Sequence, residues 1–192
     1  MRMRVVVSCE ESGIVRDAFL WHGHDAVSVD LLPSRSPGPH IQGDIRDVDL
    51  AGVDLLIGFP PCTHLAVSGA KHFSRKRVDQ FHAAVFFAWH LEQAVPKIAV
   101  ENPIGVMSTW LRPPDQIFQP WMFGHPETKA TCLWLKGLPV LQPTDNLGPP
   151  KPEQKKLWAR VHRMPPGPDR ARDRAATYAG VAWAMATQWG TL

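Results

Sequence analysis

The sequence predicts an α/β fold in which helices cover both faces of a mostly parallel β-sheet. Short runs of valine, isoleucine and leucine alternate with segments of helical periodicity, an order typical of parallel strands joined by crossover helices. Cysteine, glycine and acidic residues follow these runs, where doubly wound sheets bind their ligands. With 192 residues, 44% of them apolar and 20% charged, we expect a soluble globular protein with a substantial core.

The first half of the chain supplies most of the expected sheet. Residues 4–8 are valine-rich and predict a buried strand. Gly13 then opens a helix that ends at Gly23, with Trp21 among its expected core residues. We expect further strands over residues 25–31, 40–45, 53–58 and 97–100, and a long amphipathic helix over residues 78–93.

The periodic pattern weakens beyond Pro103. Residues 130–135 predict one more strand, and residues 177–189 predict a final helix with an alanine-rich apolar face. The chain therefore divides into a core of residues 1–135, a proline- and arginine-rich connector of residues 136–176, and a C-terminal helical segment of residues 177–192 that packs on the core.

Charge is distributed unevenly along the chain. Residues 1–150 carry a net charge of −2, whereas residues 151–192 carry +5. A basic tail on a near-neutral body suits contact with the phosphates of nucleic acid, although a solvated surface segment has the same composition. Three cysteines without a C-x-x-C pair predict no metal site and favour a reducing compartment. No apolar run reaches membrane-spanning length, so we expect a cytoplasmic protein without membrane contact.

The first strand and turn predict a nucleoside-binding site. Asp30 ends the second predicted strand, 17 residues after Gly13, and is placed to accept two ribose hydroxyls. The alternative is that Asp30 caps a turn or helix. Because the chain has no G-x-G-x-x-G, a cofactor without phosphates such as S-adenosylmethionine fits better than NAD.

Residues 58–62, Gly-Phe-Pro-Pro-Cys, are the most specific motif in the chain. Two prolines fix the backbone before Cys62 at the end of a strand, so its thiol is held in place. A thiol is nucleophilic as thiolate, which nearby cations favour. The alternative is a buried structural cysteine. Cations that follow within 15 residues could favour the thiolate or hold phosphates: Lys71, Arg75, Lys76 and Arg77.

Glu101 ends the next predicted strand and is expected beside Cys62. Addition of a thiolate to carbon 6 of cytosine makes carbon 5 able to attack a methyl donor. An acid at ring nitrogen 3 assists this addition, and a carboxyl kept partly neutral by burial can supply it. The pair Cys62 and Glu101 therefore predicts chemistry on a cytosine ring.

These motifs resemble those of the cytosine-5 DNA methyltransferases over about residues 4–135. Residues 58–62 match their G-F-P-P-C, and residues 101–103 are similar to their E-N-V. Residues 124–131 resemble G-V-P-Q-x-R-x-R, with Lys129 and Thr131 in place of the two arginines. The chain also looks like short bacteriophage- and prophage-encoded members without a full target-recognition domain.

The resemblance implies a Rossmann-like, S-adenosylmethionine-dependent methyltransferase fold, with residues 1–135 as its catalytic and cofactor-binding core. It implies Cys62 as the covalent nucleophile, Glu101 as the group that binds the base, and Lys129 with Thr131 as supporting residues. Asp44 would meet the adenine amino group. The implied cofactor site comprises Cys9, Glu10, Ser12, Gly13, Asp30, Asp44, Phe59 and Pro60, and the expected nucleic-acid contacts are Lys71, Arg75, Lys76, Arg77, Arg160 and Arg163.

Two departures from the family pattern bear on function. Glu11 stands where the glycine-rich first motif has its first glycine. Only about 40 residues, 136–176, take the place of a target-recognition domain, which predicts low sequence specificity. Three functions stay open. The first is a DNA cytosine-5 methyltransferase, the second is an enzyme that acts on free cytosine nucleotides or single-stranded DNA, and the third is a catalytically silent DNA-binding protein. We expect a monomer.

Overall fold

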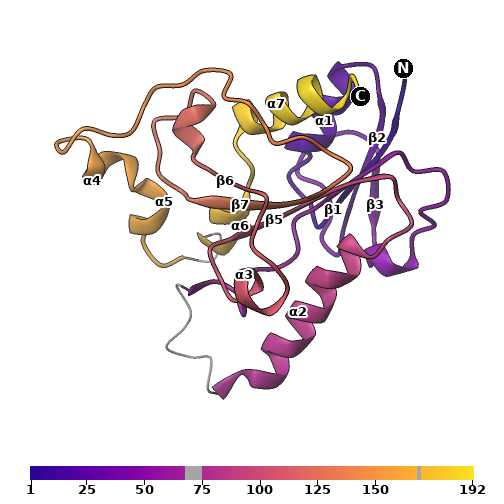
Figure 1. Cartoon of the computed structure of the whole chain (residues 1–192), viewed down its shortest axis with the longest axis horizontal. Helices are drawn as coiled ribbons and strands as arrows, with labels where there is room; N and C mark the ends of the chain where they lie inside the picture. Colours follow the sequence, from indigo (N-terminus) through magenta and orange to yellow (C-terminus); the bar gives the residue numbers. More distant parts are fainter. Residues whose placement is uncertain (68–74, 168–169) are drawn as a thin grey trace.

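The structure is a computed structural model of the chain and describes residues 1–67, 75–167 and 170–192. Within these residues the strands form one seven-stranded sheet of order β3-β2-β1-β4-β5-β7-β6 (Figure 1). Neighbouring strands are parallel except at β7, which is antiparallel to both β5 and β6. The strands are β1 (Arg4–Ser8), β2 (Asp25–Asp30), β3 (His40–Gln42), β4 (Leu55–Gly58), β5 (Lys97–Pro103), β6 (Gln116–Phe118) and β7 (Thr131–Lys136).

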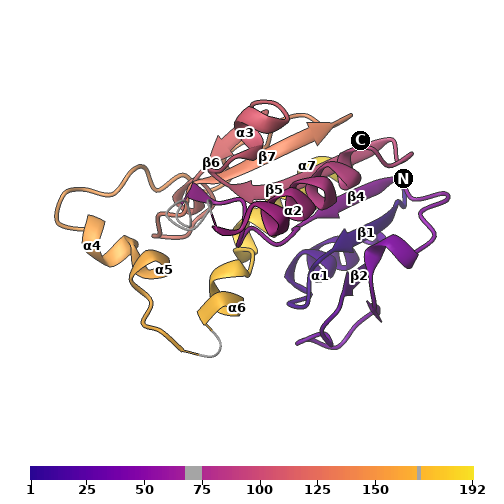
Figure 2. The same ribbon diagram turned by 90° about the horizontal axis from the view of Figure 1, so that it is seen from below.

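Helices cover both faces of this sheet. Helices α1 (Ile14–Trp21) and α7 (Ala179–Trp189) pack on one face, and α2 (Arg77–Leu91) packs on the other (Figures 1 and 2). Successive residues of β1 point to opposite faces, so Val5 and Val7 join the α1–α7 core while Val6 joins the α2 core with Phe87. The predicted Rossmann-like α/β class, with a mostly parallel sheet, is confirmed.

Several predicted boundaries differ from the structure. Strand β5 extends to Pro103, because its last three residues pair with β7, so Glu101 lies within the strand and not after it. Strand β3 ends at Gln42, and Ile45–Asp47 forms a 3-10 turn capped by Asp44. Trp21 was predicted in the core but is 77% exposed, because it lies on the outer face of α1.

Residues 136–176 are not a simple connector. They contain α4 (Lys155–Trp158), α5 (Arg160–Arg163) and α6 (Arg170–Ala175), which lie beyond one end of the sheet (Figure 2). Trp158 and Val161 are buried, and the Trp158 carbonyl accepts a hydrogen bond of 2.8 Å from the Thr128 amide. The segment is therefore anchored to the loop before β7. A further short helix, α3 (Met107–Trp110), follows β5.

Candidate active site

The turn between β1 and α1 is built around Glu10. Its carboxylate accepts hydrogen bonds from the Val15 amide at 2.7 Å, the Arg16 amide at 3.2 Å and the Ser12 hydroxyl at 3.1 Å. Gly13 adopts φ 73°, a left-handed conformation that starts the helix. Glu10 thus accepts hydrogen bonds from amides at the N-terminus of α1, and both of its carboxylate oxygens are hydrogen-bonded within the protein.

Cys9, Asp30 and Asp44 share one electrostatic environment at the ends of β1 to β3. Burial raises the pKa of the Cys9 thiol to about 11, and the charges of Asp30 and Asp44 act in the same direction. Cys9 is also in the left-handed region, with φ 58°, so the chain turns sharply at this point. The structure therefore brings these three predicted cofactor residues together.

The two aspartates differ in their availability. One oxygen of Asp30 accepts a hydrogen bond of 2.9 Å from the Leu32 amide, and burial raises the pKa of this carboxyl. Hydrogen bonds from Arg46 lower the pKa of Asp44 to about 2. Asp44 therefore remains ionised and is paired with Arg46, whereas Asp30 is bonded to the backbone amides of Leu31 and Leu32.

Ser8, His90 and Gly58 form a tight layer beneath the strand ends. The buried His90 ring bonds the Phe86 carbonyl through Nδ1 at 2.9 Å, so Nδ1 carries the proton and Nε2 accepts from the Ser8 hydroxyl at 2.8 Å. A Cβ at Gly58 would lie 2.6 Å from the His90 ring. Close packing against this ring therefore requires a glycine at position 58, the first residue of the Gly-Phe-Pro-Pro-Cys motif.

Cys62 follows β4, and Glu101 lies within the adjacent parallel strand β5. Gly58 of β4 is paired with Val100 of β5, so Glu101 is the next residue of β5 and Cys62 is in the loop that leaves β4 at the same level of the sheet. The Asn102 side-chain amide donates a hydrogen bond of 3.1 Å to the Pro60 carbonyl and joins the two segments. Phe59 is half-buried against the α1 side of the core, and Pro60 is buried.

Charge couples Cys62 to Glu101. Burial first, and the Glu101 charge second, raise the pKa of the Cys62 thiol, whereas the cations Lys129 and Arg174 lower it. Burial likewise raises the pKa of Glu101, against the effect of Lys129. A thiol, a carboxyl and two cations from four separate segments therefore act on one another at this place.

Buried polar atoms without partners occur on the segments that carry Cys62 and Glu101 and on α6. In the described residues, four buried side-chain nitrogen or oxygen atoms lack a hydrogen-bond partner, and they belong to His64, Glu101, Asn102 and Arg174. His64 lies in the turn in which the Leu65 and Ala66 amides bond the Cys62 carbonyl. Such orphan atoms are rare in proteins, and a concentration of them indicates a site for a polar ligand.

The two remaining predicted catalytic residues occupy different environments. The Lys129 ammonium lies 5.9 Å from the centroid of the Tyr178 ring. The Thr131 hydroxyl donates 3.0 Å to the Lys129 carbonyl, so it shapes the backbone of this loop. Glu127 accepts a hydrogen bond of 2.6 Å from Tyr178 and pairs with Arg160.

The predicted nucleic-acid contacts are mostly exposed. Arg75, Lys76 and Arg77 lie at the start of α2 with exposed side chains, and Arg163 is exposed on α5. Arg160 pairs with Glu127 but is still 56% exposed. None of these cations is among the charges that act on Cys62. Lys71 lies outside the described residues.

Sequence reasoning missed Arg16 and Arg174. Arg16 is fully buried and holds the loop of residues 34–39, with hydrogen bonds to the hydroxyls of Ser28, Ser34 and Ser36. An arginine between the apolar Val15 and Phe19, together with a serine-rich loop, was the available signal. Arg174 had no such signal, because its position depends on the path of α6.

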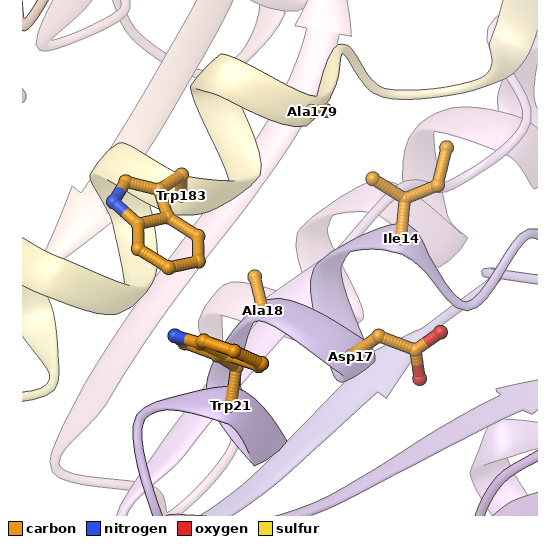
Figure 3. Close-up of a pocket in the computed structure, with 6 residues that line it drawn as sticks. All are labelled: Ile14, Asp17, Ala18, Trp21, Ala179 and Trp183. Carbon is orange, nitrogen blue, oxygen red and sulfur yellow. The ribbon is translucent and has the colours of Figure 1, made fainter.

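A shallow cavity of about 250 Å³ lies elsewhere, between α1 and α7 (Figure 3). Its rim includes the exposed Trp21 and Trp183, whose rings are 6.2 Å apart. None of the predicted site residues lines it. The lining residues are Ile14, Asp17, Ala18, Trp21, Ala179 and Trp183.

In sequence, the chain matches no protein-family model and no curated protein. In structure, it is similar to the Dnmt2 methyltransferase of S. pombe, with 14% identity, a TM-score of 0.45, and coverage of 73% of this chain and 51% of that one. It is also similar to an RNA methyltransferase from Salinibacter ruber in complex with S-adenosyl-L-homocysteine, with 14% identity, a TM-score of 0.36, and coverage of 76% and 87%. The chain thus spans about half the length of the Dnmt2 protein.

The charges around the β1–α1 turn bear on the kind of cofactor that fits. Glu10, Glu11, Asp30 and Asp44 place four carboxyl groups at the ends of the first three strands. Arg46 pairs with Asp44, and Arg35 and Arg172 pair with Glu11, so Glu10 and Asp30 are the two of these carboxyl groups without an arginine partner in the described ion pairs; they disfavour a pyrophosphate and favour a ribose or a cationic sulfonium. No group of three or more potential metal ligands occurs in the described residues, and no described helix has the length and hydropathy needed to cross a membrane.

Proposed function

We propose that the chain is an S-adenosylmethionine-dependent methyltransferase that modifies carbon 5 of cytosine in DNA, with low sequence specificity. The observation that carries this proposal is the charge coupling of Cys62 to Glu101, whose buried Oε1 has no hydrogen-bond partner among the described residues. A pyrimidine edge presents both donors and acceptors, so it can satisfy such an atom.

Glu101 would bind the base first in this proposal. Burial raises the pKa of its carboxyl, which favours a protonated group able to donate to ring nitrogen 3. Once this proton is shared with the base, nitrogen 3 withdraws electrons from the ring. Carbon 6 then becomes the point of attack for a nucleophile.

Cys62 would supply that nucleophile. Neutral Glu101 no longer repels a thiolate, and Lys129 and Arg174 attract one, so base binding itself lowers the barrier to deprotonation. The sulfur bonds to carbon 6 as the 5,6 double bond opens, and carbon 5 becomes nucleophilic. S-adenosylmethionine would supply the methyl group, held by Asp30 at the ribose and by the Cys9–Gly13 turn. After methyl transfer, which would release S-adenosylhomocysteine, carbon 5 would lose its proton to a base and the sulfur–carbon 6 bond would break, which restores the double bond.

DNA is supported as substrate by the motif resemblance and by the exposed cations Arg75, Lys76, Arg77 and Arg163. The short segment of residues 136–176 supports low specificity, because the helices that the structure describes in it have four to six residues each. A base in a duplex would have to leave the stack to reach Cys62.

One incubation tests the proposal. The protein is supplied with methyl-labelled S-adenosylmethionine and, in parallel, duplex DNA, single-stranded DNA, RNA of the same sequence and deoxycytidine triphosphate. We expect 5-methylcytosine in duplex DNA, loss of label in Cys62→Ser, and retained activity in Cys132→Ala. Label confined to RNA or to the free nucleotide would overturn the choice of substrate, and no label in any of them would overturn methyl transfer.

A further inference from the structure

Helix α6 is attached by ion pairs to the turn that follows β1. Arg172 contacts the Glu11 carboxylate at 2.8 Å, and Arg35 lies 3.3 Å from the same carboxylate. Arg35 also lies 3.6 Å from Asp173. These contacts join α6, the loop after β2 and the β1–α1 turn, and they fix where the next residue of α6 lies.

That next residue is Arg174. Its Nε is buried and has no hydrogen-bond partner in the described part of the chain, although the residue as a whole is half-buried. A buried guanidinium nitrogen without an acceptor costs free energy, so its position needs a reason beyond the packing of α6. Other orphan atoms belong to Glu101, whose charge acts on Cys62 as that of Arg174 does, and to His64, two residues after Cys62.

We propose that Arg174 is a residue of the active site, delivered by α6 to stabilise the Cys62 thiolate. This inference rests on the proposed function, since it assigns a cation to the same cysteine. The charges that face the thiol are then Glu101 from β5, Lys129 from the loop before β7, and Arg174 from α6. When Glu101 is neutral, two cations act on the sulfur without opposition.

Arginine suits this task better than lysine. A guanidinium stays charged when it is partly buried, and its remaining N–H groups can still donate to a ligand. On β7, the motif that residues 124–131 resemble has an arginine at the position of Thr131, whose hydroxyl here donates a hydrogen bond to the Lys129 carbonyl. The charge that β7 does not provide would therefore come from the segment of residues 136–176.

Alkylation of Cys62 tests the inference without any methyl transfer. The rate of reaction with iodoacetamide is measured against pH, without nucleic acid or cofactor, by mass spectrometry of the peptide that contains Cys62. Because the thiolate is the reactive form, Arg174→Gln should slow alkylation about three- to tenfold at a pH below the pKa of the thiol. Arg174→Lys should restore most of the rate, and Arg2→Gln, at an exposed arginine outside the site, should leave it unchanged.

Glu11→Gln gives a second approach that leaves Arg174 intact. It removes the carboxylate that holds Arg172, so α6 should sit less firmly and alkylation should slow about twofold or more. Thermal unfolding checks that each variant is folded. An unchanged alkylation profile in both Arg174→Gln and Glu11→Gln would overturn the inference, even in a protein that methylates DNA. If both variants are alkylated more slowly than the wild type, and the wild type transfers no methyl group, the inference is supported and the proposed function is rejected.

Discussion

The side-chain amide of Asn102 donates a hydrogen bond of 3.1 Å to the backbone carbonyl of Pro60. This bond crosses from β5 to the loop that carries Cys62, while the neighbouring residue of β5 is Glu101. The spacing between the thiol and the carboxyl group therefore depends on one buried amide. Its position in the middle of the site makes it the first target for substitution.

Asn102→Ala should uncouple Cys62 from Glu101. We expect the rate of methyl transfer to fall about 10- to 100-fold, because the two groups lose their fixed spacing. The free energy of unfolding should fall by about 1–3 kcal/mol, because the Pro60 carbonyl loses its donor. Single-turnover kinetics and urea denaturation measure the two effects. The exposed Asn146→Ala serves as control, and an unchanged rate in Asn102→Ala would contradict the expectation.

Glu101→Gln should separate activity from stability. Burial raises the pKa of this carboxyl above its ordinary value of 4.5, so the folded protein holds the proton more tightly than the unfolded chain. The resulting stabilisation is full below pH 4.5 and is lost as the pH rises through the raised pKa.

Glutamine is neutral at every pH, so Glu101→Gln should be more stable than the wild type at pH 8. This difference in the free energy of unfolding should shrink toward pH 4, where Glu101 of the wild type is protonated. Methyl transfer should fall about 100-fold or more, because the amide cannot give its proton to the base. Urea denaturation at both pH values and a labelled-methyl assay are the measurements. A stability difference that is the same at both pH values would refute this account of the carboxyl.

His90 should dominate the loss of stability in mild acid. Burial lowers the pKa of its ring from 6.5 to about 4, so between these pH values the unfolded chain binds a proton that the folded protein does not bind. Stability is therefore full above pH 6.5 and falls as the pH drops toward 4, by about 3 kcal/mol from this group. The pH dependence of unfolding should flatten by that amount in His90→Asn and remain unchanged in the exposed His82→Asn.

Gly58→Ala should disturb the packing of Ser8, Gly58 and His90 beneath the site. The added Cβ would lie 2.6 Å from the His90 ring, which is fully buried and held at both nitrogens. We expect a loss of about 1–3 kcal/mol in the free energy of unfolding. Gly43→Ala is the matched control, because an added Cβ there meets nothing within 4 Å. Equal unfolding midpoints for the two variants would show that the ring can move aside.

The sheet was predictable because its signals are local. Valine-rich runs at residues 4–8 and 25–30 and the Gly-Phe-Pro-Pro-Cys motif each identify a strand or its end without reference to distant residues. Strand β6 escaped prediction because it has three residues and depends on pairing with β7. The same pairing extends β5 past Val100, a tertiary effect that composition does not show.

The part of the candidate site formed by Cys62 and Glu101 was predictable, because a thiol and a carboxyl group at neighbouring strands indicate a chemistry by themselves. Cys62 follows β4 and Glu101 lies toward the end of the neighbouring parallel strand β5, so the order of the strands brings the two segments together. Arg174 was not predictable, because it lies more than one hundred residues from Cys62 in a basic segment that resembles a solvated tail. The exposed Trp21 was misplaced because helical periodicity alone does not tell which apolar residue faces outward.

The attachment of α6 has a consequence for any study of how ionic strength affects this protein. The helix buries none of its own residues, and the described contacts that hold it to the β1–α1 turn are ion pairs. Added salt screens such pairs as it weakens binding to a polyanion. A salt titration of turnover would therefore record two equilibria at once, docking of a helix and capture of a nucleic-acid strand, and a thiol-reactivity curve at each salt concentration would be needed to separate them.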